Sequence, residues 1–508
     1  MMLNNNFFKK IFGLALFSVK TVKKIFVLLL VFLVALIAIR IYDTERGPKL
    51  QAWHTWTPDE MSVAQVDNAS FSDYLAREDD IYKNLKENVT DKIPESEKTE
   101  LNRYYENSLV YPPKFHQDWN RSYLLMPEGK PQGAVVLLHG LTDTPYSLTE
   151  MAALYQSKGF VVVAPRLPGH GTVPAGLTSV GRNEWLAVTR MAVREATALA
   201  GEQVPLHIVG FSNGGALAMK YTLSSLNDKT LRTPQQVILL SPMIGITSFA
   251  RFAGLAGLPS IFPAFAKSAW LSIIPEFNPF KYNSFPVKAA RESFLLTQEL
   301  QQSIRELTPE DLHKVPPILT FQSVMDSTVS TRAVVNSLYR YLGDNGSELV
   351  LFDINHAVSF PPLFRRSAYT AVNSLLPRGA RNYNTIVITN LTPNSPEAVA
   401  TVTRAGETRT LTTPIGLRYP NDMFSLSHVA LPFSATDSLY GSVPVDKTRY
   451  GINLGTISMR GESSVLIVGM DALMRATSNP FFTYMMDVVE GRIACSDSSD
   501  LLACLNQH

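Results

Sequence analysis

The amino-acid sequence predicts an α/β fold with a mostly parallel sheet and helices on both faces. Two observations carry this prediction. Short apolar runs with the length of buried strands recur along the chain, and segments with helical character, such as 184–199, separate them. Alternation of this kind is typical of parallel strands joined by crossover helices. We expect strands over 119–126, 133–139, 159–165, 206–211, 236–242, 317–323 and 348–354.

One serine stands at a turn that exposes its hydroxyl. Ser212 lies between Gly210 and Gly214, directly after the apolar run 206–211 and before a run rich in Ala, Leu and Met. A sharp strand-to-helix turn strains the backbone of its central residue, and the flanking glycines remove Cβ atoms that would collide with it. The G-x-S-x-G pattern alone is weak, but this setting makes it specific. We therefore predict that Ser212 is a nucleophile.

A second glycine turn follows the strand at 133–139. Gly140 lets the chain turn sharply, so that the backbone N–H of Leu141 can point toward the serine. Together with the N–H of Asn213, at the start of the helix after the serine, it is the predicted oxyanion hole. His139 precedes the turn and is predicted to be structural.

An aspartate follows the strand predicted at 317–323. Asp326 lies in the polar loop after this strand, where a carboxylate can orient an imidazole and stabilise the imidazolium that forms during attack. Its place after the serine fits the chain order Ser, Asp, His. We predict that Asp326 is the catalytic acid.

These segments resemble the α/β-hydrolase superfamily. The resemblance covers residues 118–358 and rests on Gly210-Phe211-Ser212-Asn213-Gly214, His139-Gly140-Leu141, Leu167-Pro168-Gly169-His170-Gly171 and the Asp326 loop. Within the superfamily they are most similar to the branch of monoacylglycerol lipases, carboxylesterases and serine aminopeptidases. Residues 275–286 and 427–433 resemble membrane-anchored bacterial members. The resemblance implies an α/β-hydrolase fold and serine chemistry.

Two histidines compete for the role of base. His356 follows the strand predicted at 348–354 and lies thirty residues past Asp326, which is the usual order. His428 follows another strand-like run, 423–426, and lies within the segment that resembles the membrane-anchored relatives. If His428 is the base, residues 357–422 form an insertion beside the sheet. We favour His428 and keep His356 as the alternative.

The first forty residues differ from the rest of the chain in charge. They carry +6 with no acid, and the remaining residues carry −4, so nothing predicts a nucleic-acid surface. The apolar run 25–39 has lysines on its N-terminal side, which predicts an uncleaved signal anchor with the N-terminus in the cytoplasm. We therefore expect a single-pass transmembrane helix in the inner (cell) membrane and a periplasmic or extracytoplasmic catalytic domain.

The remaining organisation follows from composition. Region 246–312 contains runs rich in Phe, Leu, Ile and Pro, as an apolar lid over an acyl-binding cleft would, or as helices packed on the core would. With no cluster of charge, it favours an uncharged, partly hydrophobic acyl group.

Region 380–425 is rich in Thr and Val and predicts an antiparallel strand-rich extension. Cys495 and Cys504 are expected to form a local disulfide. The predicted units are a basic segment and anchor, 1–42; a polar stalk, 43–117; a hydrolase domain, 118–475; and a C-terminal tail, 476–508.

Together these features predict a serine hydrolase that cleaves carboxylic esters, lipid-like or acyl, through a Ser-His-Asp triad and an acyl-enzyme intermediate. The expected partners are a small-molecule ester or lipid and the membrane. No cofactor and no metal is expected, and the sequence predicts no oligomeric state. One alternative is a peptidase or amidase with the same triad. Another is a non-catalytic envelope interaction protein on a hydrolase scaffold.

Overall fold

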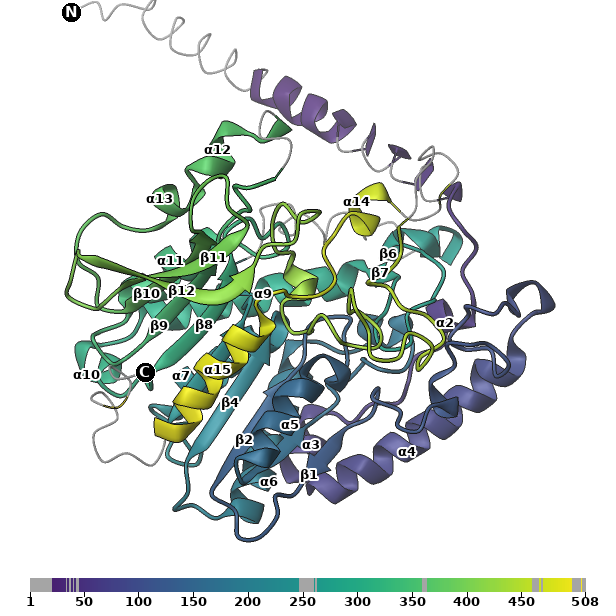
Figure 1. Ribbon diagram of the computed structural model, residues 1–508. Helices are drawn as coiled ribbons and strands as arrows, with labels where there is room; N and C mark the ends of the chain where they lie inside the picture. Colours follow the sequence, from purple (N-terminus) through teal and green to yellow (C-terminus); the bar gives the residue numbers. More distant parts are fainter. Residues whose placement is uncertain are drawn as a thin grey trace, which may run out of the picture.

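The computed structural model describes residues 21–245, 260, 263–358, 363–458, 466, 469–495 and 504, apart from residues 33, 36, 37, 40, 43 and 44. Its centre is a ten-stranded sheet in the order β1-β3-β2-β4-β5-β8-β9-β10-β11-β12 (Figure 1). The strands from β3 to β10 run parallel, which confirms the predicted mostly parallel sheet. At the two edges, β1, β11 and β12 are antiparallel to their neighbours. The strands are β1 (Tyr123–Leu125), β2 (Gly133–Leu138), β3 (Phe160–Ala164), β4 (Leu206–Phe211), β5 (Gln236–Leu240), β8 (Ile318–Ser323), β9 (Glu348–Phe352), β10 (Asn384–Asn390), β11 (Glu397–Thr403) and β12 (Thr410–Arg418).

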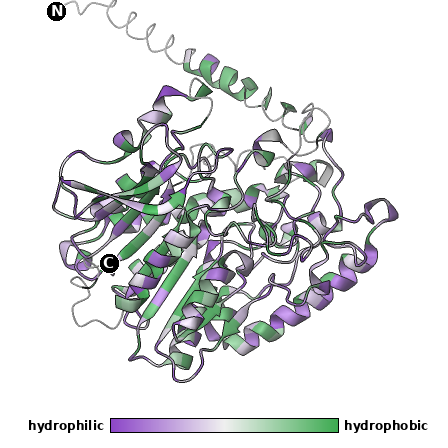
Figure 2. Ribbon diagram, in the orientation of Figure 1, coloured by the Kyte–Doolittle hydropathy of each residue, from purple (hydrophilic) through white to green (hydrophobic). Residues whose placement is uncertain are grey.

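Helices cover both faces of the sheet because the strand side chains alternate between two apolar layers. In β2, Ala134 and Val136 pack toward α6, α7 and α9, whereas Val135 and Leu137 pack toward α5 and α15. Figure 2 shows these strands as largely hydrophobic, with hydrophilic residues on the outer helices. The helices are α2 (Ala52–Thr55), α3 (Val63–Asn68), α4 (Phe71–Asn88), α5 (Thr149–Ser157), α6 (Arg182–Ala200), α7 (Asn213–Ser225), α9 (Val287–Arg305), α10 (Pro309–Leu312), α11 (Thr331–Ser337), α12 (Arg366–Tyr369), α13 (Ala371–Leu375), α14 (Met470–Leu473) and α15 (Phe482–Ala494).

The register of the parallel strands places their C-terminal ends at one edge of the sheet. Leu138 of β2 pairs with Gly210 of β4, and Phe211 of β4 pairs with Leu240 of β5. Leu240 in turn pairs with Phe321 of β8. The loops that follow β2, β4 and β8 therefore meet at this edge, where open parallel sheets bind their ligands.

The segment predicted as a polar stalk, 43–117, packs on the sheet domain instead. Its helix α4 lies along the side of the molecule (Figure 1). The side chains of Val66, Phe71 and Tyr74 are buried in the apolar layer that covers β2 and β4, and Trp53 is buried in a smaller cluster. The stalk prediction was wrong because a few large anchors, spaced among charged residues, bury this segment without a continuous apolar pattern.

A buried arginine ties this N-terminal segment to the loop after β3. The Arg166 guanidinium donates two hydrogen bonds to the carboxylate of Glu60, at 2.7 and 3.0 Å, and one to Glu78 at 3.1 Å. All three side chains are almost fully buried. Burial raises the pKa of Glu78, and the positive charge of Arg166 opposes that rise. The charges among the stalk residues are therefore partly structural, since they compensate a buried cation.

The strand-rich region predicted at 380–425 continues the main sheet. β10 adds in parallel to β9, and β11 and β12 follow as antiparallel strands at the edge. The expectation of an antiparallel extension therefore holds for β11 and β12 but not for the β9–β10 pair. Residues 423–426, predicted to be strand-like, form no strand, because the backbone bends at residues 424 and 425.

Part of the predicted lid lies within the described residues. Residues 246–259, 261 and 262 are outside them. Trp270 lies in β6 (Trp270–Ser272), which pairs with β7 (Phe285–Pro286), and packs beside Trp53. α9 packs on α7. This described part is therefore packed against neighbouring elements, which fits both ordinary core helices and a closed lid.

The two ends of the chain were predicted as an anchor and a disulfide-linked tail. Among the helices that the structure describes, none combines the length and the apolar character needed to cross a membrane. The predicted anchor, 25–39, includes residues 33, 36 and 37, which lie outside the described set. At the other end, Cys495 and Cys504 form a disulfide that follows α15.

Candidate active site

Ser212 occupies the turn between β4 and α7. Its backbone has φ 54° and ψ −113°, a conformation that non-glycine residues rarely adopt. The N–H of Ser212 donates to the carbonyl of Leu240 at 2.9 Å, and its own carbonyl accepts from Gly215 and Met243 at 3.0 and 2.9 Å. These bonds hold the strained turn in place. The Ser212 side chain lines a cavity of about 320 Å³, named here the serine cavity.

The two glycines of the elbow are required by close backbone contacts. A Cβ atom on Gly214 would lie 1.9 Å from the carbonyl oxygen of Leu138, and a Cβ on Gly210 would lie 2.4 Å from that of Gly214. Both separations are far below van der Waals contact. The sequence pattern therefore reflects how closely α7 approaches β2 and β4.

The predicted oxyanion-hole residues flank the serine. Gly140 is so close to the elbow that a Cβ on it would lie 3.3 Å from the Cβ of Ser212. Leu141 follows it and lines the serine cavity, and Asn213 is the first residue of α7. The structure thus places Leu141 in the wall of the serine cavity and Asn213 directly after Ser212 at the start of α7, and the oxyanion hole itself stays a prediction.

His139 fixes the turn that carries Leu141. Its Nδ1–H donates to the carbonyl of Gly140 at 2.9 Å, and its Nε2 accepts the N–H of Leu167 at 3.0 Å. Burial and the neighbouring His170 hold the pKa of His139 well below its ordinary value. Because both ring nitrogens are used, His139 has the structural place that its sequence position predicts.

Asp326 lies at the C-terminal end of β8 with its carboxylate buried. Oδ1 accepts the backbone N–H groups of Thr328 and Val329 at 2.8 and 3.0 Å. Oδ2 accepts Nδ1–H of His428 at 2.8 Å. Burial raises the pKa of Asp326, but the charge and hydrogen bond of His428 and the two N–H groups outweigh it and lower the pKa overall. The carboxylate is therefore charged and oriented toward His428.

His428 reaches the site from the far end of the strand-rich extension. Its side chain is buried, its ring packs on Phe211 with centroids 5.3 Å apart, and it lines the serine cavity together with Ser212. With Nδ1 bound to Asp326, its Nε2 is the nitrogen left for the serine. The loop before it is anchored by Ser323, whose hydroxyl donates to the carbonyl of Leu426 at 2.7 Å.

His356 belongs to a different pair. Its Nε2 is 3.0 Å from the carboxylate of Asp353, and its backbone N–H donates to Asn390 at 2.8 Å. It does not line the serine cavity. The structure therefore brings His428 to Asp326 and Ser212, and it leaves His356 at the end of β9 in contact with β10.

Gln322 is a site residue that the sequence reasoning missed. Its amide nitrogen donates to Oδ2 of Asp326 at 3.0 Å and to the hydroxyl of Thr331 at 3.2 Å. It thus helps to hold the carboxylate that faces His428. A signal was present, because a fully buried strand contains a glutamine only where the amide finds hydrogen-bond partners.

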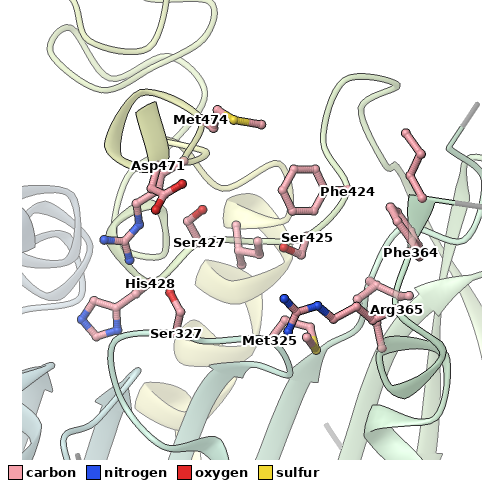
Figure 3. Close-up of a pocket in the computed structure, with 15 residues that line it drawn as sticks. Met325, Ser327, Phe364, Arg365, Phe424, Ser425, Ser427, His428, Asp471 and Met474 are labelled. Carbon is pink, nitrogen blue, oxygen red and sulfur yellow. The ribbon is translucent and has the colours of Figure 1, made fainter. Parts of the chain in front are cut away.

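Two further cavities adjoin the serine cavity. One, of about 540 Å³, is lined mainly by apolar side chains and is named the apolar cavity. The other, of about 390 Å³, begins beside His428 and ends near Phe364 and Arg365 (Figure 3); it is named the histidine cavity. Within the part of the chain that the structure describes, no three His, Cys, Asp or Glu side chains gather as a metal site requires. The described residues that line the apolar cavity include Leu101, Phe277, Phe433, Tyr440, Ile452 and Leu454.

The family comparison agrees with this architecture. Residues 135–377 match the Alpha/beta hydrolase family. A stretch of 93 residues is 33% identical to a thermostable monoacylglycerol lipase of Bacillus sp. (strain H-257); it is 18% of this chain and 35% of the lipase, so about a third of that relative's length is matched. Similar solved structures include a metagenome-derived lipolytic enzyme, at 20% identity and a TM-score of 0.38 over 46% of this chain and 88% of the other. Another is the monoacylglycerol lipase of Paleococcus ferrophilus, at 17% identity and a TM-score of 0.33 over 46% of this chain and 88% of the other. The sheet order, the serine elbow and the family match together identify residues 135–377 as an α/β-hydrolase fold.

Proposed function

We propose that this protein is a serine hydrolase that cleaves carboxylic esters through Ser212, His428 and Asp326. The observation that carries the proposal is one constellation. A serine at a strained strand-to-helix turn shares a cavity with a histidine whose Nδ1 is hydrogen-bonded, at 2.8 Å, to a buried carboxylate. Nucleophile, base and orienting acid are the three parts that acyl transfer needs.

The roles follow from this arrangement. His428 Nε2 takes the proton of Ser212 as its oxygen attacks the ester carbonyl, and the backbone N–H groups of Leu141 and Asn213 stabilise the oxyanion. Asp326 stabilises the imidazolium. The imidazolium then protonates the departing alcohol, and water, activated by the same histidine, releases the acid from Ser212.

The substrate class rests on the cavities and on the lipase-like relatives. The apolar cavity adjoins the serine cavity and is large enough for an acyl chain. The partly matched relative is a monoacylglycerol lipase, which supports an ester of a fatty acid in preference to a peptide bond.

The N-terminal segment supports a place at a membrane. Residues 1–40 carry six basic residues and no acid, and described apolar side chains such as Phe26 and Leu28 are exposed. A bilayer would remove these side chains from water, and the charge bias favours a catalytic domain outside the cytoplasm. Cell fractionation tests this part. We expect the full chain in the membrane pellet after a high-salt wash and a chain lacking 1–42 in the supernatant; a full chain found in the supernatant contradicts it.

Covalent labelling tests the catalytic proposal. The purified full-length chain is treated with a fluorophosphonate probe beside Ser212→Ala and Ser327→Ala. Ser327 is a matched control, since it is a serine near His428 that lines only the histidine cavity. We expect labelling of the unchanged chain and of Ser327→Ala, and none of Ser212→Ala. Labelling that survives the loss of Ser212 would exclude it as the nucleophile.

A further inference from the structure

Two cationic side chains border both the serine cavity and the apolar cavity. Lys281 and Arg475 are each half-buried, and each lines both spaces. Arg475 donates a hydrogen bond from Nη2 to the hydroxyl of Thr328 at 2.8 Å. Neither cation forms an ion pair with any residue that the structure describes. A half-buried cation without a counter-ion is costly, so a position of this kind favours binding of an anion.

Three acids lie near the two cations, and none forms an ion pair with them among the described residues; one is Asp471, which lines the histidine cavity together with Arg475. Asp143 is the acid among the described residues that line the apolar cavity, and its Oδ1 accepts the backbone N–H of Thr144 at 3.0 Å. Burial raises the pKa of Asp143, and the charge of Lys281 only partly offsets the rise. Asp326 is close enough to influence Arg475, but its Oδ2 is already bound by His428 and Gln322. The cavity wall therefore keeps a net positive charge at the place where the two spaces meet.

The lining of the apolar cavity indicates which kind of group the remainder of the ligand carries. Its walls come from segments far apart in the chain, including Leu101, Phe277, Phe433 and Leu454. A hydrocarbon chain fits this lining, and a polar or highly charged group does not. Val429 and Phe211 line both cavities, so a chain placed there leads directly to the serine.

We propose that the substrate is an amphiphilic acyl ester that carries an anionic group. Its hydrocarbon chain lies in the apolar cavity, its ester carbonyl lies at Ser212, and its anionic group binds Lys281 and Arg475. This inference rests on the proposed serine hydrolase activity and narrows its substrate class. It keeps the uncharged, partly hydrophobic acyl group expected from the sequence and adds an anionic group elsewhere on the substrate. No sequence pattern indicated that group, because the two cations lie far apart in the sequence and form no visible cluster there.

A matched pair of substrates tests the proposal. Monooctanoylglycerol and monooctanoylglycerol phosphate share the acyl chain and the scissile ester and differ by one phosphate. The full-length chain is assayed with both, and kcat/KM for the phosphate ester is divided by kcat/KM for the neutral one. We expect a ratio above one. This ratio should fall about tenfold or more in Lys281→Gln and in Arg475→Gln, because each variant loses a hydrogen bond between charged groups. It should recover in part in Arg475→Lys, which restores the positive charge.

The control variant is Arg365→Gln. Arg365 is a cation that lines only the histidine cavity, so the ratio should stay near that of the unchanged chain. A ratio at or below one that neither Lys281→Gln nor Arg475→Gln changes overturns the inference and leaves the hydrolase proposal intact. Absence of turnover for both esters, together with absence of fluorophosphonate labelling at Ser212, overturns the hydrolase proposal itself.

A second measurement does not depend on turnover. The non-hydrolysable octyl ether of glycerol phosphate should slow fluorophosphonate labelling of Ser212 more than the octyl ether of glycerol does. The difference should disappear in Lys281→Gln. Equal protection by the two ethers in the unchanged chain contradicts an anion site beside the serine.

Discussion

The assignment of the base separates two histidines that occupy similar surroundings. His428 and His356 each contact an aspartate, at 2.8 and 3.0 Å. Only His428 also lines the cavity of Ser212. We therefore predict that His428→Ala abolishes most ester turnover and that His356→Ala does not.

The expected magnitude follows from the burial of each pair. A general base contributes about 10²- to 10⁴-fold in rate. The side chains of His428 and Asp326 are 5% and 0% exposed, so their interaction is hardly screened by water, and we expect a loss near 10⁴-fold, about 5 kcal/mol in the barrier. The His356 side chain is 19% exposed and lies away from the serine, so His356→Ala should change kcat by less than about twofold. Its cost should instead appear in stability, about 1 kcal/mol.

The assay measures kcat with a saturating short-chain nitrophenyl ester and the rate of fluorophosphonate labelling. Thermal unfolding of each variant shows that it is folded. Asp326→Asn should lower kcat nearly as much as His428→Ala does, because it removes the carboxylate acceptor that fixes the Nδ1–H tautomer of His428. Full activity in His428→Ala combined with a large loss in His356→Ala would refute this reasoning, since the pair at the end of β9 would then be the catalytic one.

Three further predictions concern stability. Arg166→Leu leaves the buried carboxylates of Glu60 and Glu78 without their cation, so chemical denaturation should show a loss of about 3 to 5 kcal/mol; a loss below about 1 kcal/mol contradicts the packing role of the N-terminal segment. Burial lowers the pKa of His207 from its ordinary 6.5 to about 3, so it stays neutral in the fold while the unfolded chain takes up a proton below 6.5. Stability is therefore present above pH 6.5 and is lost as pH falls toward 3; between pH 7 and pH 5 the loss is about 2 kcal/mol, and His207→Gln should remove that much of the acid dependence of the unfolding free energy. Gly214→Ala places a Cβ 1.9 Å from a backbone oxygen and should cost about 3 kcal/mol or more in thermal unfolding, whereas the control Gly343→Ala, with no atom within 4 Å, should cost little.

The central sheet and the elbow were predictable because their signals are local. Each buried strand is a short apolar run. The predicted bounds of β4 match the observed ones, and those of β2 and β3 differ by at most one residue at either end. The setting of Ser212 is contained in a few neighbouring residues. The same holds for the glycine turn that carries Leu141. For these elements, hydrophobic pattern and turn chemistry point to the same structure.

The rest depends on contacts between distant segments. The segment 43–117 looks polar by composition, but Tyr74 and Glu78 pack and pair with groups more than eighty residues away. Gln322 differs from these, because Asp326 and Thr331 lie only four and nine residues after it; the buried amide was a signal, but its partners follow from how the loop after β8 folds. Lys281 and Arg475 line the same two cavities only because the fold brings distant segments of the chain to one wall. No short window along the chain contains both Lys281 and Arg475, or both Glu78 and Arg166, so pattern reasoning could not find these partners.

The route of the chain between Asp326 and His428 explains how the proposed base can lie so far from the proposed acid in sequence. Closing a long loop costs little more entropy than closing a short one, because the cost grows only with the logarithm of its length. Here much of the intervening chain is itself folded, since β10 extends the sheet from β9 and β11 and β12 complete its edge. The return is then fixed at strand ends, where Ser323 donates to Leu426 and Asn355 donates to Met423 at 2.9 Å. A histidine next to β9 is therefore not needed for the proposed triad at this sheet edge, because the returning loop is anchored at the ends of β8 and β9.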